Sequence, residues 1–251
     1  MVCPQRQDDT EDVVRCEMFT YRLSESPEYI ALSYAWGDVG DTRKILIGRA
    51  NINTSVSASL ESALRALRDP RSAVLVWADA LCIDQKNTSE KADQVRLMTQ
   101  IYQRAKSVAV WLGPRSDDSD LGMELIEKVS NGAKIPREIT RSTFAPFSEQ
   151  HFAAVVALFD RDYWHRLWVV QEVFNAQTIN VHCGPATLPW KAFQIASDVF
   201  QKHRDVLERS FHPGYSNNFY QAPFVEVYRY HNCRIIAASL LFHSYKLGLL
   251  A

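Results

Sequence analysis

Residues 74–94 read VLVWADALCIDQKNTSEKADQ, an apolar run that ends abruptly in a cluster of polar side chains. The apolar residues 74–77 predict a buried strand, and a helical pattern begins near Ser89. In open α/β sheets, ligands bind beyond the carboxyl ends of the strands. This strand end, with its loop and helix start, is therefore the expected position of a functional site.

The segments around this stretch alternate between strand and helix patterns. Further strands are expected at residues 29–36 (YIALSYAW) and 107–112 (SVAVWL), and residues 44–53 predict a short hairpin around Gly48 and Arg49. One helix carries Leu60, Leu64 and Leu67 on one face, and another covers residues 89–105. This order predicts a parallel α/β sheet with crossover helices.

The second half of the chain is expected to be mostly helical, with one added strand or hairpin. Four parts follow from this reading: an N-terminal strand and tail (1–24), an α/β core (25–135), a mostly helical part (136–205), and a C-terminal loop and helix (206–251). Within them we expect a first strand at 13–23, helices at 121–129, 148–159, 164–174 and 189–203, a strand at 178–183, a loop at 211–223 and a helix at 235–250.

The composition excludes several classes of protein. Twenty-eight Lys and Arg stand against 29 Asp and Glu, so no basic surface for nucleic acid or anionic membrane is expected. The five cysteines are scattered without C-x-x-C or zinc-ligand spacing, which favours a reducing compartment and no metal centre. The N-terminus lacks the pattern of a signal peptide, and the apolar run at 235–242 is too short to span a bilayer. We expect a cytoplasmic protein without a membrane span.

Several motifs resemble those of the fungal heterokaryon incompatibility (HET) domain. In the first half these are YIALSYAWGD (29–38), WADALCIDQ (77–85), EKADQVRLM (90–98), IYQRA (101–105) and VWLG (110–113). A second block contains RLWVVQE (166–172), VHCG (181–184) and Trp190. The motifs occur in the order expected for the family and together cover residues 25–195.

The resemblance carries expectations about fold and activity. HET domains act in self/non-self recognition between fungal individuals and in a cell-death response, and they have been proposed to be distant relatives of TIR domains. TIR domains have a flavodoxin-like parallel sheet, and several cleave NAD at the nicotinamide–ribose bond with one glutamate. The resemblance therefore implies a TIR-like or flavodoxin-like sheet, NAD as a substrate and not a prosthetic group, self-association into a homo-oligomer on activation, and a protein partner in non-self recognition.

The glutamate whose position resembles the TIR one is Glu90. Cleavage of NAD needs a carboxylate that stabilises an oxocarbenium-like transition state and aromatic walls that exclude water. Glu90 would supply the carboxylate, and Tyr34, Trp36 or Trp77 the walls. The alternative is structural: Asn87 and Glu90 have the spacing of a capping box, in which Glu90 would bond back to the first amide of the helix.

Asp79 is the second candidate catalytic residue. It follows an apolar strand, where a carboxylate needs a partner, and it would polarise a substrate hydroxyl. The alternative is an ion pair with Arg43, Arg96 or Arg166 that holds the strand end. Cys82 is expected to be a buried structural thiol, since no local Cys–His motif supports a nucleophile.

The other expected site residues would bind substrate. Arg166 and Glu172 lie on a predicted helix, with Trp168 one turn from Glu172, and they would either cover the site or form an ion pair that holds the helical half against the sheet. Gly37 and Gly40 permit close approach of a ligand or simply form a turn. The expected substrate-binding set comprises Ser33, Tyr34, Trp36, Gly37, Asp38, Cys82, Gln85, Gln94, Arg166, Trp168 and Glu172. A second hypothesis of another class is a non-enzymatic, self-associating signalling module.

Overall fold

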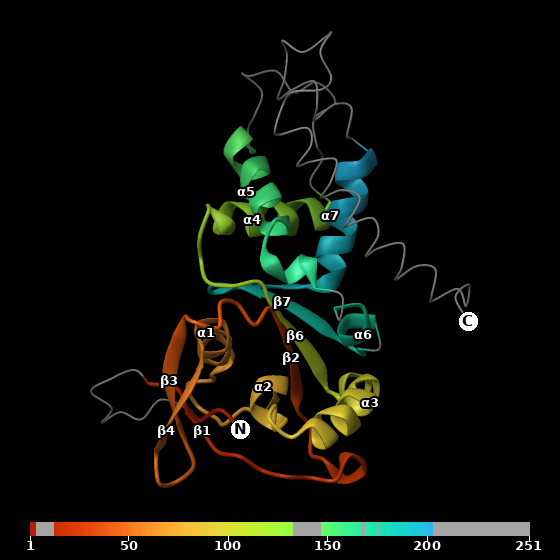
Figure 1. The fold of residues 1–251 in the computed structure, drawn as a ribbon. Coiled ribbons are helices and arrows are strands. Elements are labelled where there is room, and N and C mark those ends of the chain that lie inside the picture. Colours follow the sequence, from red (N-terminus) through yellow and green to blue (C-terminus); the bar gives the residue numbers. More distant parts are fainter. Residues whose placement is uncertain (4–12, 133–146, 167–168, 175, 203–251) are drawn as a thin grey trace. The chain divides into compact units, whose positions relative to one another are not determined.

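The structure, a computed structural model, describes residues 1–3, 13–132, 147–166, 169–174 and 176–202 (Figure 1). The loop predicted at 211–223 and the helix predicted at 235–250 lie outside these residues. Contacts divide the chain into two compact units, each discontinuous in sequence. The first is Met1–Pro114 with His165–Pro185, and the second is Arg115–Trp164 with Ala186–Ala251.

The larger sheet has the strand order β5-β2-β6-β7-β8. Its strands are β2 (Ile30–Tyr34), β5 (Val76–Trp77), β6 (Ser107–Trp111), β7 (Ile179–Cys183) and β8 (Ala186–Pro189). The pairs β2/β5, β2/β6 and β6/β7 are parallel, as predicted. Only two residues join β7 to β8, too few for a parallel crossover, so the sheet is mixed and not wholly parallel. The fold is therefore mixed α/β with flanking helices.

Strands β2 and β6 form the centre of the first unit. Both are nearly continuous runs of buried residues, as expected for strands covered on both faces. Helix α1 (Ala58–Leu67), capped by Ser57, packs Leu60 and Leu64 into one core cluster with Tyr34 and Trp111. Helix α3 (Thr88–Arg104) is fastened to β2 by the Tyr102 hydroxyl, which donates to the Leu32 carbonyl at 3.0 Å.

A smaller sheet completes the first unit, with the order β1-β3-β4. Strands β3 (Thr42–Ile47) and β4 (Ile52–Ser57) form the predicted hairpin. Strand β1 (Arg15–Cys16) is much shorter than the strand predicted at 13–23, and a 3-10 turn, η1 (Leu23–Glu25), follows it. The helix α2 (Asp79–Cys82), directly after β5, was not predicted.

The second unit contains α4 (Ser119–Ser130), α5 (Glu149–Phe159) and α7 (Trp190–Lys202), close to their predicted bounds. Trp164 packs there against Phe159, Trp190 and Phe193. The prediction of a continuous helix at 164–174 is wrong. It is divided into η2 (Asp162–His165) and α6 (Val169–Phe174), because the chain passes from the second unit to the first between Trp164 and His165. No described helix is both long and apolar enough to cross a membrane.

Helices α4 and α5 approach closely at Gly122. A Cβ there would lie 2.6 Å from Leu158 Cδ1 and 3.0 Å from the backbone of Ala154. Replacing a helical glycine by alanine normally gains about 1 kcal/mol. We expect Gly122→Ala instead to lower the free energy of unfolding by about 1–2 kcal/mol, because overpacking outweighs the propensity gain. Gly40→Ala, whose Cβ would meet nothing closer than 3.4 Å, is the matched control; equal effects of the two in chemical denaturation would contradict the packing argument.

Candidate functional site

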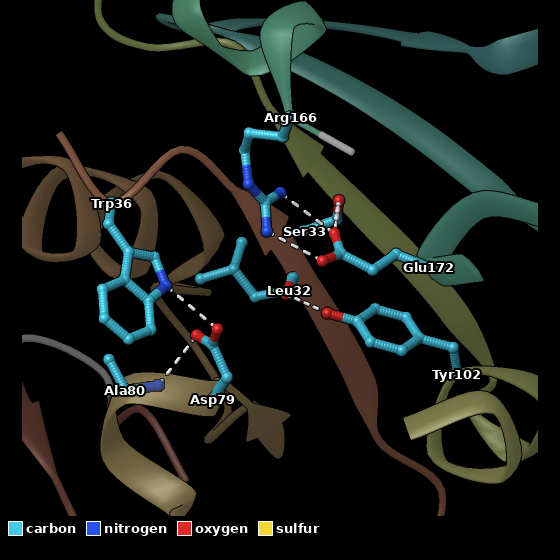
Figure 2. A network of polar contacts seen from close by, with 8 residues as sticks. All are labelled: Leu32, Ser33, Trp36, Asp79, Ala80, Tyr102, Arg166 and Glu172. Atoms are coloured by element: carbon cyan, nitrogen blue, oxygen red, sulfur yellow. Dashed lines mark hydrogen bonds and ion pairs between the residues drawn. The ribbon is translucent and has the colours of Figure 1, made fainter. Parts of the chain in front are cut away.

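Polar side chains from three segments gather at the carboxyl end of β2 (Figure 2). Ser33 and Tyr34 belong to β2, and Trp36 follows it. Asp79 is the first residue of α2, directly after β5, while Arg166 precedes α6 and Glu172 lies within it. Because β2 and β5 are parallel, their carboxyl ends meet at one edge of the sheet. All of these residues belong to the first unit.

The centre of this polar cluster is a buried ion pair between Arg166 and Glu172. The Arg166 guanidinium donates to both carboxylate oxygens, from Nη1 to Oε2 at 3.0 Å and from Nη2 to Oε1 at 2.7 Å. The Ser33 hydroxyl donates to Oε2 at 2.5 Å. Glu172 is only 1% exposed, and a carboxylate buried to that degree is tolerated only with such partners. The predicted ion pair is therefore confirmed, and it joins α6 to β2.

Asp79 has a different environment. Its Oδ2 accepts from Trp36 Nε1 at 2.9 Å and its Oδ1 from the Ala80 amide at 2.8 Å, both neutral donors. The predicted ion pair with an arginine is wrong, since the three candidates pair with other carboxylates: Arg43 with Asp41, Arg96 with Asp93, and Arg166 with Glu172. Among the described residues, the half-buried Asp79 side chain therefore has no ion-pair partner, and both of these hydrogen-bond donors are neutral.

The Tyr34 hydroxyl adds a buried hydrogen-bond donor close to Asp79, with which it interacts. Tyr34 is 1% exposed, and its hydroxyl makes no hydrogen bond of ordinary geometry to a described residue. Burial, and next the charge of Asp79, raise the pKa of Tyr34, so the hydroxyl keeps its proton. Trp111, its register partner on β6, also has a buried Nε1 without a described partner. A buried donor without a well-placed acceptor lowers stability. The Tyr34 hydroxyl and Trp111 Nε1, at the ends of neighbouring strands, therefore mark a position that favours an acceptor.

Glu90 does not join this cluster. The Asn87 side chain accepts from the Glu90 amide at 3.2 Å, which confirms the predicted helix cap. The second half of the predicted capping box is wrong, because Glu90 Oε1 accepts from the amide of Asp84, at 3.1 Å, and not from that of Asn87. Among the described residues, no hydrogen bond or ion pair joins Glu90 to Asp79, Arg166 or Glu172. Its carboxylate instead closes the loop that precedes α3.

The remaining predicted residues support loops or lie elsewhere. Gln85 Nε2 donates to the Asp79 carbonyl at 3.1 Å, and Asp38 Oδ1 accepts from the Gly40 amide at 2.8 Å in an exposed turn. Gly37 has a φ of +75°, which suits glycine. Cys82 and Gln94 line a cavity with Trp77. Trp168 lies outside the described residues.

Burial raises the pKa of the Cys82 thiol, although the Ala78 backbone opposes this shift. The thiolate, not the thiol, is the nucleophile, so a raised pKa makes Cys82 less reactive near neutral pH. This supports the interpretation of Cys82 as a structural thiol.

Comparison with known proteins agrees with the motifs. Residues 29–172, more than half of the chain, match the model of the family described as heterokaryon incompatibility protein (HET). The chain therefore belongs to this family, and the matched region contains every residue of the polar cluster. It is 30% identical over 254 residues to heterokaryon incompatibility protein 6, OR allele, of Neurospora crassa. That match covers 84% of this chain but 37% of the relative, so the chain spans little more than a third of the relative's length. No solved structure significantly matches the present chain.

The ion pair generates a prediction about stability. Arg166→Met keeps much of the side-chain volume but leaves the Glu172 charge buried with Ser33 alone. Breaking a buried pair costs about 3–5 kcal/mol, and the 19% exposure of Arg166 places the expected loss at the lower end. The double variant Arg166→Met/Glu172→Gln should lose less, since it removes the unpaired charge. Chemical denaturation measures both.

The exposed pair of Arg96 with Asp93 provides the control for this prediction. Their side chains are 80% and 66% exposed, so Arg96→Met should change stability by less than about 0.5 kcal/mol. A double variant as unstable as Arg166→Met alone would contradict the assignment of the loss to an uncompensated charge.

The raised pKa of Cys82 predicts slow alkylation. At pH 7–8, iodoacetamide should label Cys82 more slowly than an unstructured thiol, and the rate should rise only as the pH approaches the raised pKa. Residue-resolved mass spectrometry measures this rate, with the denatured chain as the reference. Labelling of Cys82 in the folded chain as fast as in the denatured chain would refute the interpretation of a structural thiol.

Proposed function

We propose that this chain is an effector domain of fungal heterokaryon incompatibility, which takes part in self/non-self recognition and a cell-death response. Membership of the HET family supports this role, as does the similarity to a Neurospora protein named for heterokaryon incompatibility. The observation that carries a chemical proposal is the polar cluster at the carboxyl end of β2. It is assembled entirely from residues of the matched region.

At a finer level, we propose that the domain hydrolyses NAD at the nicotinamide–ribose bond. Numbered within the larger sheet, the first four strands have the order 2-1-3-4, which is also how the flavodoxin-like order 2-1-3-4-5 begins. In that arrangement the ligand lies at the switch point between the first and third strands. Here these strands are β2 and β6, whose carboxyl ends carry Tyr34 and Trp111. The strand order thus supports a TIR-like site at the polar cluster.

The reaction requires few protein groups. The bond between ribose C1′ and the nicotinamide nitrogen breaks, and its electron pair leaves with nicotinamide. A water oxygen bonds to C1′ and releases a proton to Asp79 or to solvent. The transition state carries positive charge at C1′, which the Asp79 carboxylate, without an ion-pair partner among the described residues, would stabilise. Tyr34 would donate to a ribose hydroxyl, and the 43% exposed indole of Trp36 would form an aromatic wall.

Within this proposal the three acidic residues have different roles. Glu172 is 1% exposed and paired with Arg166, so it positions α6 against β2 and does not touch substrate. Glu90, the residue that the TIR resemblance favours, bonds the loop before α3, whereas Asp79 bonds Trp36 at the carboxyl end of β2, and the geometry therefore favours Asp79 as the catalytic carboxylate. Both assignments remain predictions that mutation tests separately.

A non-enzymatic, self-associating module is the second candidate. It is favoured by the fact that the strongest interaction in the cluster, between Arg166 and Glu172, is satisfied within the chain. On this proposal the cluster only holds α6 against β2. The domain would then signal through assembly with a second copy or another protein, without turnover of NAD.

Asp79→Asn is the decisive change. Asparagine keeps the size and can still accept from Trp36, but it removes the charge, so nicotinamide release from NAD should fall about 10²-fold or more. Glu90→Gln is the matched control and should retain most of the activity. Release is measured with the purified full chain over a range of protein concentrations, together with toxicity on expression in a fungal host.

Each result separates the proposals. Equal turnover by Asp79→Asn and the wild type would exclude Asp79, and loss of turnover in Glu90→Gln alone would restore Glu90 as the catalytic carboxylate. Absence of turnover at every concentration, together with toxicity that Asp79→Asn retains, would establish the signalling module instead.

A further inference from the structure

A separate cavity of about 330 Å³ opens in the first unit between the segment 18–29, β5 and α3. This volume falls within the range of about 300–1,000 Å³ typical of small-molecule sites. Its lining includes Trp77 and Cys82 from the WADALCIDQ motif and Gln94 from α3. The cluster residues Ser33, Asp79, Arg166 and Glu172 are not part of this lining, so the cavity is a different place from the one assigned to NAD.

Four aromatic side chains contribute to the otherwise mainly aliphatic walls of this cavity. Two of these rings are held by other contacts. The Tyr29 hydroxyl donates to the Ile101 carbonyl at 2.6 Å, and the Trp77 ring packs edge-on against Tyr102 at 5.6 Å between ring centroids. The other two, Phe19 and Tyr21, stack on one another at 6.3 Å and 25°. They are 49% and 48% exposed, which is unusual for rings of this size. The cavity thus has an ordered aromatic wall and a partly exposed aromatic rim.

The charge of the lining restricts the ligand. Among the residues that the structure describes, no Lys, Arg, Asp or Glu side chain contributes to it. The formal charge among the described lining residues is the amine of Met1, which already donates to the Glu17 carbonyl at 2.7 Å. A phosphate or carboxylate would lose its hydration here in exchange for a contact with this amine alone, and this is costly. The chemistry therefore favours an uncharged molecule.

Gln94 supplies a group that would orient such a molecule. Its side chain is half-buried and makes no hydrogen bond to another described residue. Both the amide donor and the carbonyl acceptor of Gln94 are therefore available to a ligand. Ligand sites typically combine apolar and aromatic walls with a few polar groups of this kind. A planar ring stacks well on aromatic side chains, and an amide or ring nitrogen on it would pair with Gln94.

From these observations we infer that the cavity binds an uncharged, planar aromatic molecule that bears an amide or an equivalent donor–acceptor pair. The class includes nucleobases and aromatic carboxamides. The inference does not depend on NAD cleavage at Asp79. Tyr21 and Gln94 would be the contacts that decide affinity and orientation, while Tyr29 and Trp77 hold the wall in place.

The test is a chemical-shift titration of the isotopically labelled full chain with four probes. Adenine and benzamide are neutral and planar, benzoate differs from benzamide in charge, and cyclohexanecarboxamide keeps the amide but lacks a planar ring. We expect saturable binding of the first two and at least tenfold weaker binding of the other two. Stronger or equal binding of benzoate would overturn the exclusion of charge, and equal binding of cyclohexanecarboxamide would overturn the requirement for a planar ring.

Two variants and two controls locate the binding. Tyr21→Ala removes a half-exposed ring and should weaken benzamide binding about fivefold or more. Gln94→Leu has nearly the same shape and should weaken it without unfolding the chain. Ile52→Ala, a 63% exposed position on the β3–β4 hairpin, is the matched control and should leave affinity unchanged. Asp79→Asn should also leave the affinity of the cavity for benzamide unchanged, whatever its effect on NAD cleavage. Unchanged affinity in both Tyr21→Ala and Gln94→Leu, or no saturable binding of adenine and benzamide, would refute the inference.

Discussion

The buried carboxylate of Glu172 is the constraint on which the site depends. The chain leaves the first unit at Pro114 and returns at His165, so the returning segment has to find its place against strands formed much earlier in the sequence. Glu172 and Ser33 are 139 residues apart and lie within one hydrogen bond of each other. A charge buried to this degree tolerates almost no other arrangement, because a shift of α6 would leave it unpaired. The ion pair thus contributes more to specifying one position for α6 than to overall stability.

The same constraint explains why the carboxylates of the HET motifs are not equivalent. Glu172 uses both oxygens within the chain, and Glu90 bonds the amide of Asp84. Asp79 is held by Trp36 and by the Ala80 amide, neutral donors that orient the carboxylate without cancelling its charge. A carboxylate that is ordered, partly exposed and not in an ion pair stabilises a developing cation better than one already paired with arginine. On the proposed function, chemistry at this site would depend on Asp79, while the geometry of the site depends on Glu172.

The sequence was sufficient to predict elements that depend on residues close together in the chain. The apolar runs of β2 and β6, the leucine face of α1 and the Asn87 cap of α3 are properties of a few neighbouring residues, and the structure confirms each of them. The sequence was insufficient to predict contacts between residues that are far apart in the chain. The spacing of Trp164, Arg166 and Glu172 fits a helix, but Trp164 and Glu172 belong to different cores, and nothing in the local pattern shows this. The neutral partner of Asp79 was missed for a similar reason, since charge alone suggests an arginine and not the indole of Trp36.

The motif WADALCIDQ combines apolar and polar residues because it borders two different places. Asp79 contributes to the cluster at the carboxyl end of β2, whereas Trp77 and Cys82 line the aromatic cavity. Helix α2 is only four residues long, and Gln85 ties the loop after it to the Asp79 carbonyl. A strand of two residues followed by one helical turn presents an acid to one place and an aromatic ring to the other. The abrupt change from apolar to polar at Trp77 is therefore a consequence of that short connection, and it does not mark a single reactive centre.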